Sequence, residues 1–121
     1  MHFNKIMIIF AVDLKKKIMN KQILKEIRTL KRQILPNEKV FLFGSQARGD
    51  AREDSDWDLL ILLNKDKRNF NEDFDNYAYP FTEIGLKYDT VISPKIYTVK
   101  DWKLHPSMFR YNVERDRKEI K

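Results

Sequence analysis

The stretch KVFLFGSQARGDAREDSDWDLLILL, residues 39–63, decides the fold of this chain. It contains two short apolar runs, Val40–Phe43 and Trp57–Leu63. Continuous apolar runs of this length, bounded by small and polar residues, are typical of strands that are buried on both faces. The stretch therefore predicts two central strands joined by a polar connection. In that connection, residues 45–52 are expected to form a short helix after a tight turn, with Gly49 limiting its length.

Two carboxylates, Asp56 and Asp58, open the second strand. Side chains two residues apart on a strand point to the same face, so Trp57 points to the other face and is expected in the core. Two like charges this close repel each other, and a bound divalent cation removes that penalty. Paired carboxylates, with substrate phosphates completing the shell, suit magnesium. The alternative is that both carboxylates simply lie in solvent at the entry to the strand.

Gly44 and Ser45 form the turn at the end of the first strand. A glycine there permits a positive φ angle or a close approach of the backbone to a ligand. The start of the following helix would direct N–H groups at an anion, and the Ser45 hydroxyl adds a further donor. This pattern predicts a phosphate-binding turn, different from the G-x-x-x-x-G-K-[ST] loop, which the sequence lacks. The alternative is that Ser45 serves only as a helix N-cap.

The flanking sequence predicts further helices and strands around this centre. Apolar spacing and turn residues set their boundaries. Because helices and strands alternate, the predicted fold class is α/β (α+β), with a small mixed β-sheet flanked by helices. The expected elements are a helix from the N-cap Asn20 to Ile34, ended by Pro36; a helix over Phe70–Leu86 with a kink or break at Pro80 and a C-terminal breaker at Gly85; a strand over Tyr88–Ile92; a short strand over Ile96–Val99; and a helix over Ser107–Glu119.

The composition narrows the class of protein. A chain of 121 residues suits one domain. The sequence has no cysteine, which excludes disulfides and thiolate zinc sites. The net charge of +6 favours polyanionic partners such as a nucleoside triphosphate. The lysines are scattered, without the arginine–aromatic series typical of single-strand binders, so nucleic acid is not expected as a partner.

The N-terminal segment carries an apolar run, Ile6–Val12. The run is too short to span a bilayer and lacks the basic region and cleavage site of a signal peptide. We expect no membrane partner, a cytoplasmic location, and burial of this run as an additional strand or a helical turn. The regular helical pattern begins only at Met19. Residues 1–18 are therefore interpreted as an N-terminal extension, and residues 19–121 as a single domain.

The motif GSQARGDAREDSDWD, residues 44–58, resembles the signature of the nucleotidyltransferase superfamily related to DNA polymerase β. In that signature Gly-Ser is followed, ten residues later, by Asp-x-Asp. The internal ARG and SD elements are similar to the minimal nucleotidyltransferase branch, which includes antitoxins of modules whose toxins have the HEPN fold. The resemblance covers about Ile23–Val113 and implies the polymerase β-like nucleotidyltransferase fold.

The resemblance also implies a magnesium site of three carboxylates. Asp56 and Asp58 would ligate the metal, with two magnesium ions bound, and a neighbouring strand would provide the third carboxylate. Asp89 matches that position, because it follows the long predicted helix and starts an apolar strand. The other candidate, Glu83, lies in the preceding helical segment. Asp89 would complete the metal site and help to deprotonate the attacking hydroxyl.

The resemblance further implies how ATP is held. Gly44 and Ser45 would bind its β- and γ-phosphates. Arg48, which is also in the family pattern, would contact the triphosphate or the acceptor. The alternative for Arg48 is an ion pair that shapes the loop, with one of three candidate partners: Asp50, Glu53 or Asp54.

The implied reaction is magnesium-dependent transfer of a nucleoside monophosphate, AMP from ATP, to a hydroxyl group, with pyrophosphate leaving. In the toxin-linked branch the acceptor is a tyrosine of the HEPN-type toxin, so the expected partner is a HEPN-like protein and the expected role is that of its antitoxin. One alternative is a non-catalytic antitoxin that neutralises its partner by binding alone. The other is a small-molecule nucleotidyltransferase of the antibiotic-modifying kind.

Overall fold

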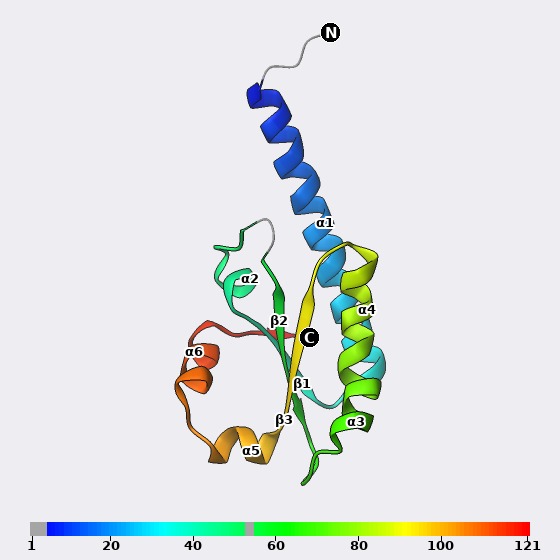
Figure 1. The fold of residues 1–121 in the computed structure, drawn as a ribbon, viewed down its shortest axis with the longest axis vertical. Coiled ribbons are helices and arrows are strands. Elements are labelled where there is room, and N and C mark those ends of the chain that lie inside the picture. Colours follow the sequence, from blue (N-terminus) through cyan, green and yellow to red (C-terminus); the bar gives the residue numbers. More distant parts are fainter. Residues whose placement is uncertain (1–4, 53–54) are drawn as a thin grey trace.

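The fold is a four-stranded mixed sheet with helices on both faces, and the computed structural model describes it over residues 5–52 and 55–121. Figure 1 shows α1 and α4 on one side of the sheet and α5 and α6 on the other. The predicted class of a small mixed sheet flanked by helices is confirmed. The elements are α1 (Lys5–Ile34), β1 (Lys39–Phe43), α2 (Ser45–Arg48), β2 (Trp57–Leu63), α3 (Phe70–Asp73), the π-helical turn η1 (Phe74–Ala78), α4 (Tyr79–Lys87), β3 (Ile92–Thr98), α5 (Val99–Leu104), α6 (Met108–Asp116) and β4 (Lys118–Ile120).

The strand order β3-β2-β1-β4 places the two predicted central strands in the middle of the sheet. β1 is antiparallel to both β2 and β4, whereas β2 and β3 are parallel. In this register Asp58 lies between Phe43 on β1 and Ser93 on β3. Residues paired across a sheet point to the same face, so the register shows which side chains of β1 and β3 surround Asp58.

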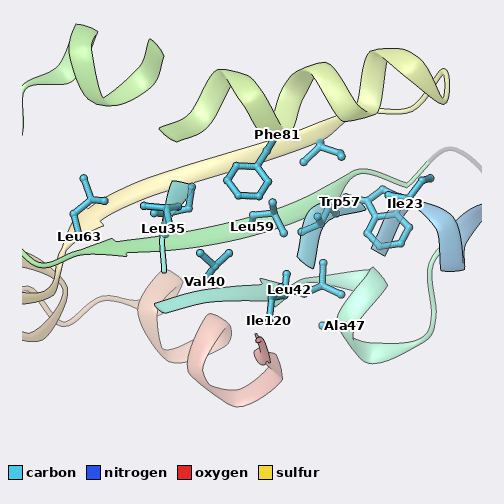
Figure 2. Packing of buried hydrophobic residues seen from close by; sticks show 13 residues of the cluster. Ile23, Leu35, Val40, Leu42, Ala47, Trp57, Leu59, Leu63, Phe81 and Ile120 are labelled. Atoms are coloured by element: carbon cyan, nitrogen blue, oxygen red, sulfur yellow. The ribbon is translucent and has the colours of Figure 1, made fainter. Parts of the chain in front are cut away.

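The larger hydrophobic core lies between the sheet and helices α1 and α4 (Figure 2). Alternate residues of β2, Trp57, Leu59 and Ile61, point into it. They pack with Phe81 of α4 and Ile23 of α1, both of which are fully buried. The prediction that Trp57 packs in the core is confirmed.

The opposite face of the sheet is covered by α5 and α6, and we call it the α5/α6 face. Leu60 and Leu62 of β2 are buried there with Trp102 of α5 and Val113 of α6. Asp58 belongs to the same alternating row of β2 as these leucines. Its carboxylate therefore points to the α5/α6 face, away from the larger core.

Helix α1 begins earlier than predicted. It includes residues from Lys5 onward, so Asn20 lies inside the helix and does not cap it. The expectation that the Ile6–Val12 run is buried is wrong, because its large apolar side chains are all at least half exposed. Figure 1 shows this part of α1 extending beyond the sheet, away from the labelled helices and strands. Within the described ranges, no helix is long and apolar enough to cross a membrane.

The segment predicted as one helix over Phe70–Leu86 consists of α3, η1 and α4 in succession. A kink or break was expected at Pro80; the chain stays helical there, and Pro80 lies in the first turn of α4 directly after the π-helical turn. A proline in a first helical turn removes no intrahelical hydrogen bond. Gly85 was expected to end the helix, and this is wrong. It is buried inside α4, where a Cβ would lie 2.7 Å from the carbonyl oxygen of Thr90.

The predicted strand over Tyr88–Ile92 is also wrong. Most of this segment closes the end of α4, because the N–H groups of Tyr88 and Thr90 donate to the carbonyl of Gly85 at 3.1 and 3.0 Å. Asp89 between them has a φ angle of +54°, the left-handed conformation that commonly follows a helix. Hydrogen bonds that close the helix therefore replace those that a strand would have made here.

The third strand begins at Ile92, opposite Trp57, and continues to Thr98. The short strand predicted over Ile96–Val99 is the second half of this strand and not a separate element. Thr98 then caps α5, because its side chain accepts a hydrogen bond from the N–H of Asp101 at 3.0 Å.

The last helix is shorter than the predicted Ser107–Glu119. Ser107 caps α6, which ends at Asp116. Arg117 is extended, and its guanidinium lies 4.2 Å from the centre of the Phe41 ring. The remaining residues form β4, whose Ile120 is buried opposite Val40. Residues 118–120 therefore pair with the free edge of β1, and burial of Ile120 stabilises this pairing.

Candidate active site

Gly44 brings the backbone at the end of β1 against the carboxylate of Asp58. Its φ and ψ angles are +73° and −157°, a region that is essentially restricted to glycine. A Cβ atom built on Gly44 would lie 2.6 Å from Oδ2 of Asp58. A side chain at this position would therefore displace the carboxylate, and glycine is required for the close approach.

Ser45 starts the one-turn helix α2, and Gly44 takes the N-cap position in its place. The carbonyl of Gly44 accepts hydrogen bonds from the N–H groups of Ala47 and Arg48 at 3.1 and 3.0 Å. The first N–H groups of a helix have no partner within it and are available to an anion. Gly49 ends α2 in the left-handed conformation, so the helix is shorter than the predicted residues 45–52.

Asp56 and Asp58 stand at the start of β2. Asp58 is half-buried on the α5/α6 face, and Asp56, just before the strand, is exposed. Burial raises the pKa of Asp58 above the ordinary aspartate range, and the negative charge of Asp56 raises it further. The positive charges of Lys95 and Arg48 offset only part of this effect. A half-buried carboxylate with a raised pKa beside a second carboxylate is typical of a functional site.

This pair of carboxylates fits a divalent cation of the magnesium type. Magnesium prefers oxygen ligands, commonly one or two carboxylates together with substrate phosphates and water. Burial and the charge of Asp56 disfavour the ionised form of Asp58, and the positive charge of a cation would favour it. Over residues 5–52 and 55–121, no three Asp, Glu, His or Cys side chains group closely enough to hold a metal.

Asp89 is exposed in the turn that precedes β3. The N–H of Trp57 donates to the carbonyl of Val91 at 2.8 Å, and Trp57 pairs with Ile92, so Asp56 lies level with Val91. Asp89 comes two residues before Val91 in the chain. Asp89 thus lies at the correct end of the sheet but does not form a three-carboxylate group with Asp56 and Asp58. Its role as the third ligand stays a prediction.

Glu83, the other candidate for the third carboxylate, lies far from this pair in the architecture. It belongs to α4 and lines a cavity of about 730 Å³ between α1 and α4. Because α4 covers the sheet face opposite the α5/α6 face, Glu83 and Asp58 are on different sides of the sheet.

Arg48 extends from the end of α2 and forms two ion pairs. Its Nε lies 3.2 Å from Asp50, and its NH1 lies 3.1 Å from Asp116 at the end of α6. Arg115 first, and then Arg48, hold the pKa of Asp116 below its usual range. The predicted ion pair with Asp50 is present, whereas the pair with Asp116 was not foreseen. The other predicted partners, Glu53 and Asp54, lie outside the described residues.

Lys95 is a charged residue of this site that the sequence alone did not indicate. It lies on β3 opposite Leu60, so it shares the α5/α6 face with Asp58. Its charge acts on Asp58 directly, as the effect on the Asp58 pKa shows. The register between β2 and β3 places Lys95 on this face. A third strand at residues 88–92, as predicted, does not include Lys95.

Comparison with known proteins agrees with this geometry. The family model described as "Nucleotidyltransferase domain" matches residues 20–119. Two proteins of Methanocaldococcus jannaschii are similar to this chain. "Putative protein adenylyltransferase MJ0141" is 40% identical over 82 residues, which are 64% of this chain and 74% of the relative. "Putative protein adenylyltransferase MJ0604" is 38% identical over 74 residues, which are 56% of this chain and 67% of the relative.

A solved structure described as "Crystal structure of the toxin-antitoxin with AMP-PNP" has the same fold. It aligns with a TM-score of 0.57 at 17% identity, over 81% of this chain and 72% of that chain. The predicted polymerase β-like fold and the predicted enzyme class, a nucleotidyltransferase, are confirmed by the family match over most of the chain. The chain, with its glycine turn set against the Asp58 carboxylate, belongs to the nucleotidyltransferase domain family.

Proposed function

We propose that this chain is a magnesium-dependent adenylyltransferase that transfers AMP from ATP to a tyrosine hydroxyl of a partner HEPN-type toxin, and so acts as an antitoxin. The nucleotidyltransferase class follows from the family. Two similar proteins, each named "Putative protein adenylyltransferase", support AMP as the transferred group and a protein as the acceptor. A structural neighbour described as a toxin–antitoxin with AMP-PNP supports the partner.

The observation that carries the proposal is the contact between Gly44 and Asp58. The backbone of the phosphate-binding turn and a carboxylate at the start of β2 are so close that no Cβ fits between them. A nucleotidyltransferase needs this proximity, since the same triphosphate must meet both the N–H groups that bind its phosphates and the carboxylates that hold its cations.

Each group at the donor side has a proposed task. The turn at Gly44 and Ser45 binds the β- and γ-phosphates, and Arg48 contacts the triphosphate. Asp56 and Asp58 hold magnesium, with two ions expected. When bound, the metal supplies the positive charge that neutralises the phosphates and the leaving pyrophosphate.

The transfer is a displacement at the α-phosphorus. The acceptor oxygen forms a bond to that phosphorus, the bond from the α-phosphorus to the oxygen bridging it to the β-phosphate breaks, and pyrophosphate leaves. We propose that the carboxylate of Asp89 takes the proton of the acceptor hydroxyl. Asp89 and Asp56 are both exposed, so a side chain of another protein has access to them.

The experiment combines the purified chain, magnesium, ATP labelled at the α-phosphate and a HEPN-type toxin as the candidate acceptor protein. The partner is expected to acquire the label, and a metal chelator is expected to prevent it. The double variant Asp56→Asn plus Asp58→Asn should lose labelling entirely. The matched control replaces two exposed carboxylates away from this site, Asp66→Asn plus Asp75→Asn, and should label like the natural chain.

The outcomes separate the alternatives. Equal labelling by the Asp56/Asp58 double variant would remove the catalytic assignment. Full neutralisation of the toxin by that variant, without labelling, would favour a non-catalytic antitoxin. Label found on a small molecule and not on the protein would favour the small-molecule nucleotidyltransferase.

A further inference from the structure

Lys95 lies on the α5/α6 face beside the two carboxylates. β3 is an edge strand, paired only with β2 within the sheet. The parallel register sets Ser93 opposite Asp58 and Lys95 opposite Leu60. Lys95 is thus one alternate position further along the same face than Ser93, which is about 7 Å for two strand residues. A lysine side chain spans that distance, so its ammonium reaches the region above Asp58.

The Lys95 ammonium is available to a ligand. Its side chain is exposed, and within the described ranges it takes part in no hydrogen bond or ion pair. Arg48, the other cation that acts on Asp58, is by contrast held by Asp50 and Asp116. Lys95 can therefore bind an anion without breaking an ion pair between described residues, whereas Arg48 cannot.

The order of these groups across the sheet indicates which anion this is. Gly44 follows β1, Asp58 is on β2 and Lys95 is on β3, and β2 lies between the other two strands. If the turn at Gly44 holds the β- and γ-phosphates, the α-phosphate lies over Asp58, because the reacting phosphorus must face the metal-binding carboxylates. Ser93 is the residue directly opposite Asp58 on β3, and Lys95, two residues further along the same face, is the next cationic group on the side opposite the leaving pyrophosphate.

We propose that Lys95 binds the α-phosphate of the nucleotide and positions it for attack, an inference that rests on the proposed function of the Gly44–Asp58 site. A lysine ammonium beside two carboxylates adds a charge-assisted hydrogen bond to a non-bridging phosphate oxygen. It also offsets the repulsion between that oxygen and the carboxylates. Lys95 is not proposed to contact the β- and γ-phosphates, which are assigned to the turn at Gly44 and Ser45.

The test measures binding, so it needs no acceptor. Calorimetric titrations at constant magnesium would use three probes: α,β-methylene-ATP, in which the reacting bond cannot break, AMP, and inorganic triphosphate. Lys95→Met is expected to weaken the first two by about tenfold or more, the scale of a hydrogen bond to a charged group. Affinity for inorganic triphosphate should stay within about twofold. Lys95→Arg should restore most of the loss, and Lys100→Met, an exposed lysine at the start of α5, is the matched control.

Three results would overturn the inference. They are unchanged affinity of Lys95→Met for AMP and α,β-methylene-ATP, an equal loss for inorganic triphosphate, and an equal loss in Lys100→Met. The proposed function fails in a different way. If the natural chain binds α,β-methylene-ATP in a Lys95-dependent manner but labels no partner, Lys95 still binds the α-phosphate. The proposed transfer of AMP to a protein is then wrong.

Discussion

Replacing Gly44 with alanine tests the contact on which the active site depends. The new methyl group meets two obstacles, one in the backbone and one in space. The φ and ψ angles of +73° and −157° belong to a region that is unfavourable for every residue except glycine. The Cβ atom would also lie 2.6 Å from Oδ2 of Asp58, so that carboxylate must move.

The size of the effect follows from these two obstacles. Backbone strain in this region costs roughly 1–3 kcal/mol. Forcing the Asp58 side chain away from its rotamer adds about 0.5–1.5 kcal/mol. Gly44→Ala should therefore lower the free energy of unfolding by roughly 1.5–4.5 kcal/mol, the sum of the two ranges. It should also reduce nucleotide transfer strongly, because the carboxylate that holds the cation is displaced.

The matched control is Gly49→Ala, which changes the other positive-φ glycine of this loop. Gly49 has a φ angle of +83°, but its Cβ would meet no atom of the described residues within 4 Å. Strain alone predicts a loss of about 1–2 kcal/mol for that variant. Urea unfolding, followed by circular dichroism and tryptophan fluorescence, measures both losses, and the transfer assay shows whether Gly49→Ala keeps its activity.

A double-mutant cycle isolates the contact with Asp58. In an Asp58→Ala background, the contact part of the Gly44→Ala loss should disappear and the strain part should remain. The explanation is refuted if Gly44→Ala costs no more than Gly49→Ala. It is also refuted if the cost of Gly44→Ala is the same with and without the Asp58 side chain.

Two further predictions concern stability. Asp58→Asn should raise the free energy of unfolding at neutral pH while it abolishes transfer, because the pKa of Asp58 is raised in the folded state and its ionised form is disfavoured there. That gain should shrink as the pH falls below the ordinary aspartate pKa, because the carboxyl is then protonated in both the folded and the unfolded state. Urea titrations at several pH values measure this change. A gain in the free energy of unfolding that does not depend on pH would contradict the prediction. Removal of residues 1–18, the proposed extension, should change the free energy of unfolding by less than about 1 kcal/mol, because the large apolar side chains between Ile6 and Ile18 are at least half exposed. Ile23→Ala, which empties a fully buried position on the same helix, should cost about 2–5 kcal/mol, and a truncation that costs as much would show that residues 1–18 belong to the domain.

The sequence alone determined the centre of this protein. The two apolar runs of residues 39–63 form adjacent strands, and the glycine turn and the carboxylates lie where these strands begin and end. Strand, turn and alternation are local signals, because they depend on residues only a few positions apart. For the same reason Trp57 could be assigned to the core and Asp58 to the opposite face.

Tertiary structure decided everything that depends on which surfaces meet. Hydrogen bonds that close α4 shifted the third strand from residues 88–92 to Ile92–Thr98, and this shift left Asp89 in a turn and brought Lys95 beside Asp58. The free edge of β1 turned the expected end of the last helix into β4. The first turns of α1 extend beyond the sheet, so an apolar run expected in the core is exposed. Register and burial arise from contacts between distant segments, and the local pattern of a single segment contains no information about its partner.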